Sequence, residues 1–205
     1  MNFDEGIARI KEVLAEMGYN ILGYNHTEAQ LQSLLPWFYP KKKDGVLPPE
    51  VGEFLNQVKD MYPIVACHHK KATGQVNTDV FCGIKADGLS IEAIQNILKE
   101  AEATFHKIEK ERFPPKTVGW SLKRTNYVSV TLALIYENGL ADSDIKTVQS
   151  CWKKLGLNRP KPKDLFSTRP FIIDLVNKIA YPHKGIPLIS NAPLPKKFAT
   201  AVFGL

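Results

Sequence analysis

Long apolar segments are missing from this chain of 205 residues. No run of about 18 uninterrupted apolar residues occurs, which argues against a transmembrane helix. The first residues, Met1-Asn2-Phe3-Asp4-Glu5, lack the basic and then apolar order of a secretory signal. With 44% hydrophobic and 23% charged residues, the chain has enough apolar material for a packed core, which excludes a disordered or fibrous protein. We therefore expect a soluble, cytoplasmic protein.

Cysteine and the common catalytic motifs are also scarce. Cys67, Cys82 and Cys151 are the only cysteines, and their odd number and wide spacing fit neither a disulfide framework nor paired zinc ligands. The sequence contains no GxxxxGK[ST], GxGxxG, HExxH or GxSxG motif and no EF-hand loop. The direct sequence evidence for nucleotide binding, zinc proteolysis, serine hydrolysis and calcium sensing is therefore absent, and no cofactor is predicted.

Acidic residues become rare in the second half of the chain. Residues 1–100 contain 10 Lys and Arg against 13 Asp and Glu, whereas residues 101–205 contain 17 against 8. From Cys151 onward there are 10 basic residues and two acidic ones, a net charge of +8. A localised positive charge of this kind favours a polyanionic partner, of which nucleic acid is the commonest and an anionic membrane surface the second.

Apolar periodicity and turn signals predict both helices and strands. Apolar residues that recur every three or four positions predict helices over 4–17, 27–35, 48–61, 91–112, 142–155 and 170–179. Runs rich in β-branched and aromatic residues predict strands over 64–70, 78–85, 117–122 and 128–136. Residues 181–197 contain four prolines and are predicted to form an extended tail.

The order strand, strand, long helix, strand predicts an α+β fold. We expect a small mixed β-sheet, made of a hairpin and a crossover strand, packed against a long helix. Helical N- and C-terminal regions and an extended, proline-rich tail complete this fold. The chain then divides into a helical N-terminal region (1–61), an α+β core (62–156) and a basic helical C-terminal extension with the tail (157–205), which together form one compact unit.

The hairpin concentrates side chains that could bind a metal ion. If Cys67 lies opposite Cys82, then Cys67, His69 and Cys82 share one face of the sheet and could hold a zinc ion. A register shifted by one residue places Cys67 beside Val80 or Phe81 instead. Because free cysteines are among the most commonly buried residues, a purely structural role is the competing interpretation.

The same hairpin raises the hypothesis of a thiol-dependent enzyme. Cys67 or Cys82 would be the nucleophile, a nearby histidine the base and Asp79 the residue that orients the base. Successive residues of a strand point to opposite faces, so Cys67 and His68 cannot form the hydrogen bond that this mechanism requires. A metal- or thiol-dependent enzyme is therefore the third of our hypotheses.

Cations and aromatic side chains occur together in three segments. Such a combination favours phosphate neutralisation with base stacking, and we predict a non-enzymatic accessory protein that binds DNA or RNA. The predicted phosphate contacts are Lys123, Arg124, Lys153, Lys154, Arg159, Lys161 and Lys163. The predicted stacking residues are Trp37, Trp120 and Tyr127. Each of these aromatic side chains could instead pack in the core or at its rim.

The second hypothesis is a protein-interaction or scaffold module that recognises an acidic protein. It would use Trp37-Phe38-Tyr39 or the C-terminal tail, in which Leu188, Ile189, Leu194 and Phe198 could dock in a groove of the partner. Alternatively, the tail covers a face of its own sheet.

Overall fold

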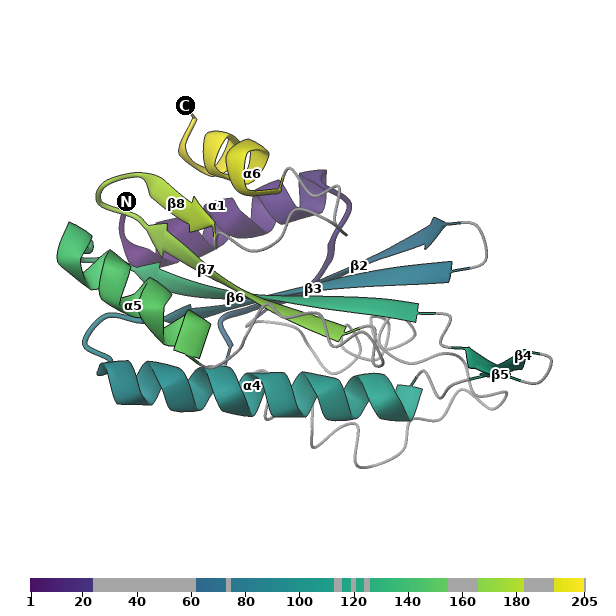
Figure 1. The fold of residues 1–205 in the computed structure, drawn as a ribbon. Coiled ribbons are helices and arrows are strands. Elements are labelled where there is room, and N and C mark those ends of the chain that lie inside the picture. The colour runs from purple at the N-terminus through teal and green to yellow at the C-terminus, as the bar shows by residue number, and fades with distance from the viewer. Residues whose placement is uncertain are drawn as a thin grey trace.

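A six-stranded mixed β-sheet runs through the molecule and carries helices on both faces (Figure 1). The computed structural model describes residues 1–23, 62–72, 75–112, 116–118, 121–123, 126–154, 166–182 and 194–204. The predicted helices 27–35 and 48–61 lie outside these residues. The main sheet contains β1 (Asn20–Gly23), β2 (Ile64–Ala72), β3 (Gln75–Lys85), β6 (Asn126–Tyr136), β7 (Phe166–Asp174) and β8 (Ile179–Pro182), in this order across the sheet. Two short strands, β4 (Lys116–Val118) and β5 (Ser121–Lys123), pair with each other.

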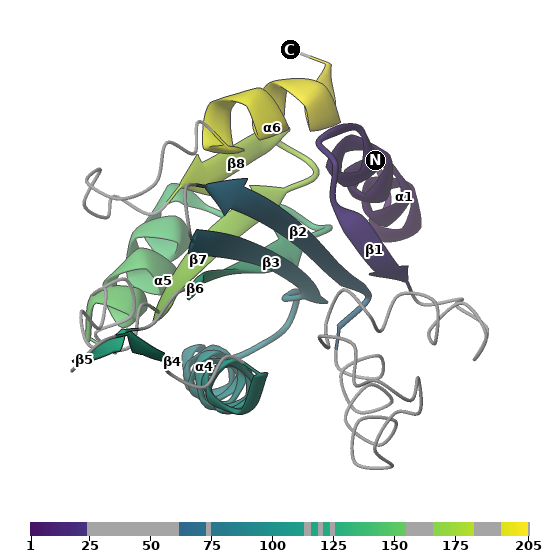
Figure 2. The same ribbon diagram turned by 90° about the vertical axis from the view of Figure 1, so that its right-hand side faces the viewer.

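Three neighbouring strands of the main sheet are parallel, and the outer strands are antiparallel to their neighbours. Strands β3, β6 and β7 are parallel, whereas β1 to β3 form an antiparallel meander and β8 returns beside β7. The two crossovers carry α4 (Ile91–Arg112) and α5 (Asp142–Lys154), and both helices lie on the same face (Figure 2). The α+β prediction, with a mixed sheet against the long helix, is confirmed.

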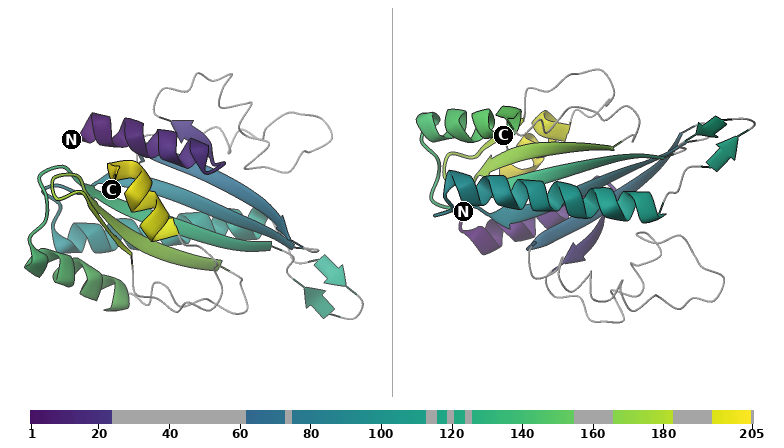
Figure 3. Two further views of the ribbon diagram at one scale, coloured as in Figure 1. Left: turned by 90° about the horizontal axis from the view of Figure 1, so that it is seen from above. Right: turned by 60° about the horizontal axis from the view of Figure 1, so that its bottom comes forward.

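The opposite face carries the first and last helices, α1 (Phe3–Glu16) and α6 (Leu194–Phe203), which lie side by side (Figure 3). Helix α1 begins with a capping box, in which the Glu5 N–H donates to Asn2 Oδ1 at 2.9 Å and the Asn2 N–H donates to Glu5 Oε2 at 3.0 Å. Its last residue is Glu16, and after the Met17 cap the chain turns at Gly18, whose φ of +84° suits glycine. The residue that caps this helix is therefore Asn2, and the helix begins one residue before the predicted start at Asp4.

Aromatic side chains join the last helix to the sheet. Phe198 of α6 is fully buried, and its ring centroid lies 5.5 Å from that of Phe81 in β3 and 5.8 Å from that of Phe171 in β7. The prediction of an extended tail over 181–197 is wrong for residues 194–197, which begin α6, and Phe198 belongs to the protein's own core rather than to a partner's groove. Pro195 misled the prediction because proline is tolerated in the first turn of a helix.

The predicted helix over 170–179 is also wrong. These residues form the end of β7, a turn and the start of β8. Phe171, Ile172 and Ile173 are buried on both faces of the sheet, between β6 and β8. A short apolar run of this kind does not reveal by its period whether it is a buried strand or a helix. Strand β1 was not predicted.

The sheet takes strands from each of the three sequence segments, 1–61, 62–156 and 157–205. Its inner strand β6 is buried on both faces from Val130 to Tyr136, except at Thr131, which is half-buried. Burial on both faces explains why this run is almost entirely apolar. Among the described residues, no helix is long and apolar enough to cross a membrane.

Candidate functional sites at the two ends of the sheet

The three parallel strands end together at one end of the sheet, which we call the carboxyl end. Ligands of open α/β sheets bind beyond this end, between the loops that follow the strands. Each strand has an acidic residue there: Asp87 follows β3, Glu137 follows β6 and Asp174 ends β7. The opposite end, where the parallel strands begin, is called the amino end.

Two of these carboxylates fix the loop between β6 and α5. The oxygens of Asp87 accept hydrogen bonds from the N–H groups of Glu137 and Asn138, both at 2.8 Å. Asp174 is fully buried and accepts from the N–H of Leu140 at 3.0 Å. It also accepts from the turn after β7, where the Asn177 N–H and Nδ2 donate at 2.9 and 2.7 Å. This loop is therefore held from both sides.

The third carboxylate ties the N-terminal helix to the sheet. Glu137 accepts a hydrogen bond from the Phe3 N–H at 3.0 Å and forms an ion pair with Lys85. The hydrogen bond with Lys85 lowers the pKa of Glu137 and raises the pKa of Lys85. The Lys85 amine also lies 4.9 Å from the centre of the Phe3 ring. Within the described residues, no three His, Cys, Asp or Glu side chains are grouped to hold a metal ion.

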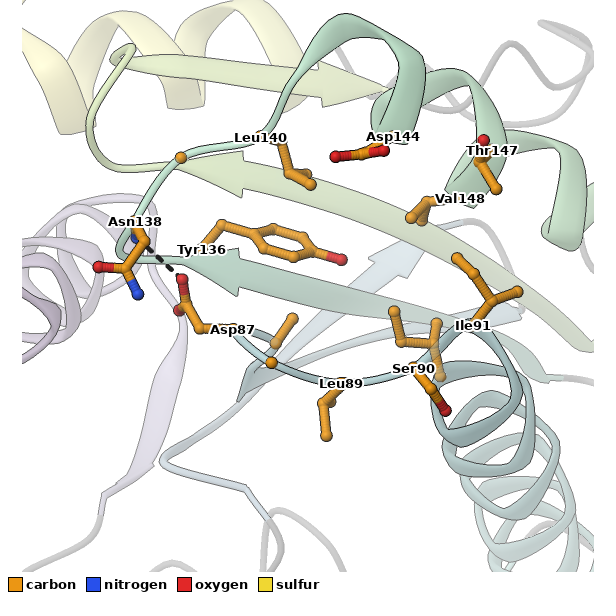
Figure 4. Close-up of a pocket in the computed structure, with 14 residues that line it drawn as sticks. Asp87, Leu89, Ser90, Ile91, Tyr136, Asn138, Leu140, Asp144, Thr147 and Val148 are labelled. Carbon is orange, nitrogen blue, oxygen red and sulfur yellow. Dashed lines mark hydrogen bonds between the residues drawn. The ribbon is translucent and has the colours of Figure 1, made fainter.

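A pocket of about 420 Å³ opens at the carboxyl end, between the loops that follow β3 and β6 and the first turns of α4 and α5 (Figure 4). Its apolar lining includes Leu89, Ile91, Leu140 and Val148, and the Tyr136 ring lies across it. We call it the carboxyl-end pocket. None of the residues that line it is a lysine or an arginine.

The polar groups of the carboxyl-end pocket come mainly from the two helix starts. Ser90 caps α4 by accepting from the Ala93 N–H at 3.1 Å. Thr147 of α5 donates to the Ser143 carbonyl at 2.9 Å. Asp144, in the first turn of α5, is exposed, and one of its oxygens accepts from the Ser143 hydroxyl at 3.3 Å.

The sequence predicted neither this pocket nor its residues as a site. The available signal was the pair of turns, Ala86-Asp87-Gly88 and Asn138-Gly139, that follow two predicted strands. Their meeting at one end of the sheet depended on β3 and β6 being parallel neighbours, which the sequence alone did not establish.

The hairpin register decides which of its residues can meet. Cys67 pairs with Val80, and Cys82 pairs with Val65, so Cys67 does not lie directly opposite Cys82. Asp79 is three positions from Cys82 on the same strand and therefore lies on the opposite face of the sheet. Asp79 cannot orient a base that serves Cys82, so this version of the thiol-enzyme hypothesis loses its third residue. His69 pairs with Thr78.

Cys82 is buried beneath α4, close to Tyr62. Cys82 is 1% exposed and Tyr62 is 4% exposed. Burial raises the pKa of the Tyr62 phenol well above its ordinary value, and the nearby Cys82 and Glu100 add to this effect. This environment keeps both groups away from solvent and is typical of core packing.

Four of the predicted nucleic-acid contacts belong to helices and strands that the structure describes. Lys123 ends β5, and Tyr127 lies at the start of β6, where it pairs with Asn77. Strands β4 and β5 lie beyond the amino end of the main sheet, whereas α5, whose last residues are Lys153 and Lys154, stops well short of that end (Figure 1). The structure therefore does not place Lys123 and these two lysines in one cluster. Trp37, Trp120, Arg124, Arg159, Lys161 and Lys163 lie outside the described residues.

Charge is nevertheless segregated along the sheet. The chain passes the amino end three times, between β2 and β3, between α4 and β6, and between α5 and β7. In the sequence, these connections and the adjoining ends of their helices and strands, residues 68–77, 105–127 and 155–169, hold 12 Lys and Arg and three Asp and Glu, a net charge of +9. The rest of the chain has 15 against 18, a net charge of −3. Residues 73–74, 113–115, 119–120, 124–125 and 155–165 lie outside the described residues, and the described remainder of the three segments holds eight Lys and Arg and two Asp and Glu, a net charge of +6. We call these three segments the basic end.

Comparison with protein-family models, curated proteins and solved structures gave no significant match. Function is therefore argued from the two ends of the sheet.

Proposed function

We propose that the protein binds nucleic acid through the basic end. The observation that carries this proposal is the charge segregation, because the described helix and strand ends of three segments distant in the sequence lie toward the amino end with a net charge of +6. A concentrated positive field attracts a polyphosphate and releases its counterions, whereas the same charge spread evenly would mainly increase solubility.

Two of the three segments contain predicted phosphate contacts. Lys123 and Arg124 belong to the segment between α4 and β6, and Arg159, Lys161 and Lys163 to the one between α5 and β7. These side chains would contact phosphates, and Lys153 and Lys154 would extend the surface along α5. Trp120 and Tyr127 lie in the first of these segments and would stack on unpaired bases, as in proteins that bind single strands. Trp37 remains a third candidate for stacking.

A direct test is a titration against labelled single-stranded and double-stranded DNA and RNA at about 50 and about 200 mM salt. We expect micromolar or tighter binding at the lower salt, with a loss of orders of magnitude at the higher salt if six or more phosphates are contacted. Stronger binding to single strands would support a role for the aromatic residues.

A matched pair of variants separates local charge from total charge. Arg159→Glu, Lys161→Glu and Lys163→Glu together change the net charge by −6, as do Lys99→Glu, Lys146→Glu and Lys178→Glu. The second set is exposed and lies outside the basic end. We expect the first variant to lose at least about tenfold in affinity and to flatten the log–log salt slope by about three. The second should lose much less.

Two results would overturn the proposal: no binding of any nucleic acid at 50 mM salt, or equal losses in the two triple variants. Recognition of an acidic protein would then take its place. Deleting residues 182–205 is not a clean test of that alternative, because the deletion removes Phe198 from the core.

A further inference from the structure

We propose that the carboxyl-end pocket binds a small organic cation, a molecule with an apolar or aromatic body and one ammonium group. This site is independent of the nucleic-acid surface, because it lies at the opposite end of the parallel strands. Its volume of about 420 Å³ lies within the range of small-molecule sites.

The lining of the pocket suits an apolar body. Leu89, Ile91, Leu140 and Val148 surround the Tyr136 ring, which spans the pocket between the two loops (Figure 4). A flat ligand could pack against the aliphatic side chains around this ring, which is itself 5% exposed, and release water from them. The aliphatic residues come from both loops and both helices, so the ligand would bridge α4 and α5.

The charge of the lining selects a cation. Asp87 and Asp144 are the charged residues that line the pocket, and their full negative charges outweigh the partial positive charges of about half a unit each at the starts of α4 and α5, so an anionic ligand would meet repulsion. Both oxygens of Asp87 already accept hydrogen bonds from the loop after β6. Asp144 is exposed at the rim beside Thr147, and only its Oδ1 accepts the long hydrogen bond from Ser143. Asp144 is therefore the carboxylate that would receive the ammonium group.

The walls of the pocket are fixed before any ligand arrives. Asp87 holds Glu137 and Asn138 from one side, and Asp174 holds Leu140 from the other. Ser90 caps the helix that forms the lower wall. A ligand would therefore bind without the entropic cost of ordering a loop, which favours affinity for a small molecule.

The test uses three probes of similar size and different charge: 2-phenylethylamine, 2-phenylethanol and 3-phenylpropionate. Each is titrated to about 10 mM into the ¹⁵N-labelled full chain at constant ionic strength, and amide chemical shifts are recorded. We expect saturable shifts at Gly88, Gly139 and Thr147 with the amine, weaker shifts with the alcohol and none with the carboxylate.

Two variants and one control locate the site. Asp144→Asn should weaken binding of the amine about three- to tenfold while leaving the alcohol unchanged. Asp142→Asn is the matched control, since Asp142 is exposed in the same helical turn and does not line the pocket. Thr147→Trp places a large side chain at an exposed position of the rim and should reduce binding of both probes. The spectra of the free variants report whether each is folded.

The proposal fails if the amine and the carboxylate give equal shifts, or if the pocket amides do not shift up to 10 mM. It also fails if Asp144→Asn and Asp142→Asn reduce affinity for the amine equally, because the attraction would then be a general effect of charge.

Discussion

Asp174, the last residue of β7, accepts a hydrogen bond from the backbone N–H of Leu140, with 3.0 Å between Oδ2 and the nitrogen. Leu140 lies in the loop after β6, so this bond joins two neighbouring parallel strands beyond the point where they stop pairing. The same carboxylate also holds the turn between β7 and β8 through Val176 and Asn177. One buried side chain thus determines the position of two loops.

Replacing this carboxylate should destabilise the protein. Asp174→Asn keeps the size of the side chain but exchanges one acceptor oxygen for a donor that faces N–H groups. We expect a loss of about 2–3 kcal/mol in the free energy of unfolding, measured by urea denaturation. Asp142→Asn, an exposed control at the start of α5, should cost less than about 1 kcal/mol. Equal losses in the two variants would show that the buried network does not stabilise the fold.

Removing the Phe198 ring should open a cavity between α6 and the sheet. The ring is fully buried against Phe81 and Phe171, and truncations of this kind cost about 3–5 kcal/mol. Thr200→Ala alters an exposed side chain of the same helix and should change stability by less than about 0.5 kcal/mol. Thermal and urea unfolding measure both variants. Wild-type stability in Phe198→Ala would mean that α6 does not close the core.

The buried phenol of Tyr62 should make stability fall at high pH. Its pKa is raised in the folded protein, so the folded state keeps the phenolic proton when the unfolded chain, with a pKa near 10.0, has lost it. The contribution is fully present below pH 10 and is lost as the pH rises above that value.

Comparison with Tyr62→Phe isolates this contribution from those of other titrating groups. Between pH 9 and 11, we expect the stability of the wild type to fall more steeply than that of the variant. The difference in slope should approach about 1.4 kcal/mol per pH unit at the upper end. Parallel curves for the two proteins would show that the phenol ionises freely in the folded state.

Much of the fold could be predicted from local patterns. The helices at 4–17, 91–112 and 142–155 matched α1, α4 and α5 to within one residue at most ends, because their apolar faces repeat with the helical period. The hairpin and the central strand were predicted from their β-branched residues and the turns that follow them.

The errors occurred where a local pattern suits two kinds of secondary structure, or where contacts with residues distant in the sequence determine which structure forms. Phe171 to Ile173 suit a buried strand as well as a helix, and only their position between β6 and β8 selects the strand. Pro195 indicates an extended tail until Phe198 is seen to fill the space between the sheet and α1. The carboxyl-end pocket could not be predicted, since it depends on which strands are parallel neighbours.

The order of the strands has a consequence for folding during synthesis. From β1 to β8, each strand of the main sheet is added beside the previous one, so the sheet can grow from one edge as the ribosome releases the chain. Helix α1 is made before the sheet, yet it packs beside α6, whose residues 194–203 are made after all the strands of the main sheet. We therefore expect the apolar face of the nascent sheet around Phe81 and Phe171 to stay incompletely covered until α6 emerges, which makes that face a natural binding surface for chaperones.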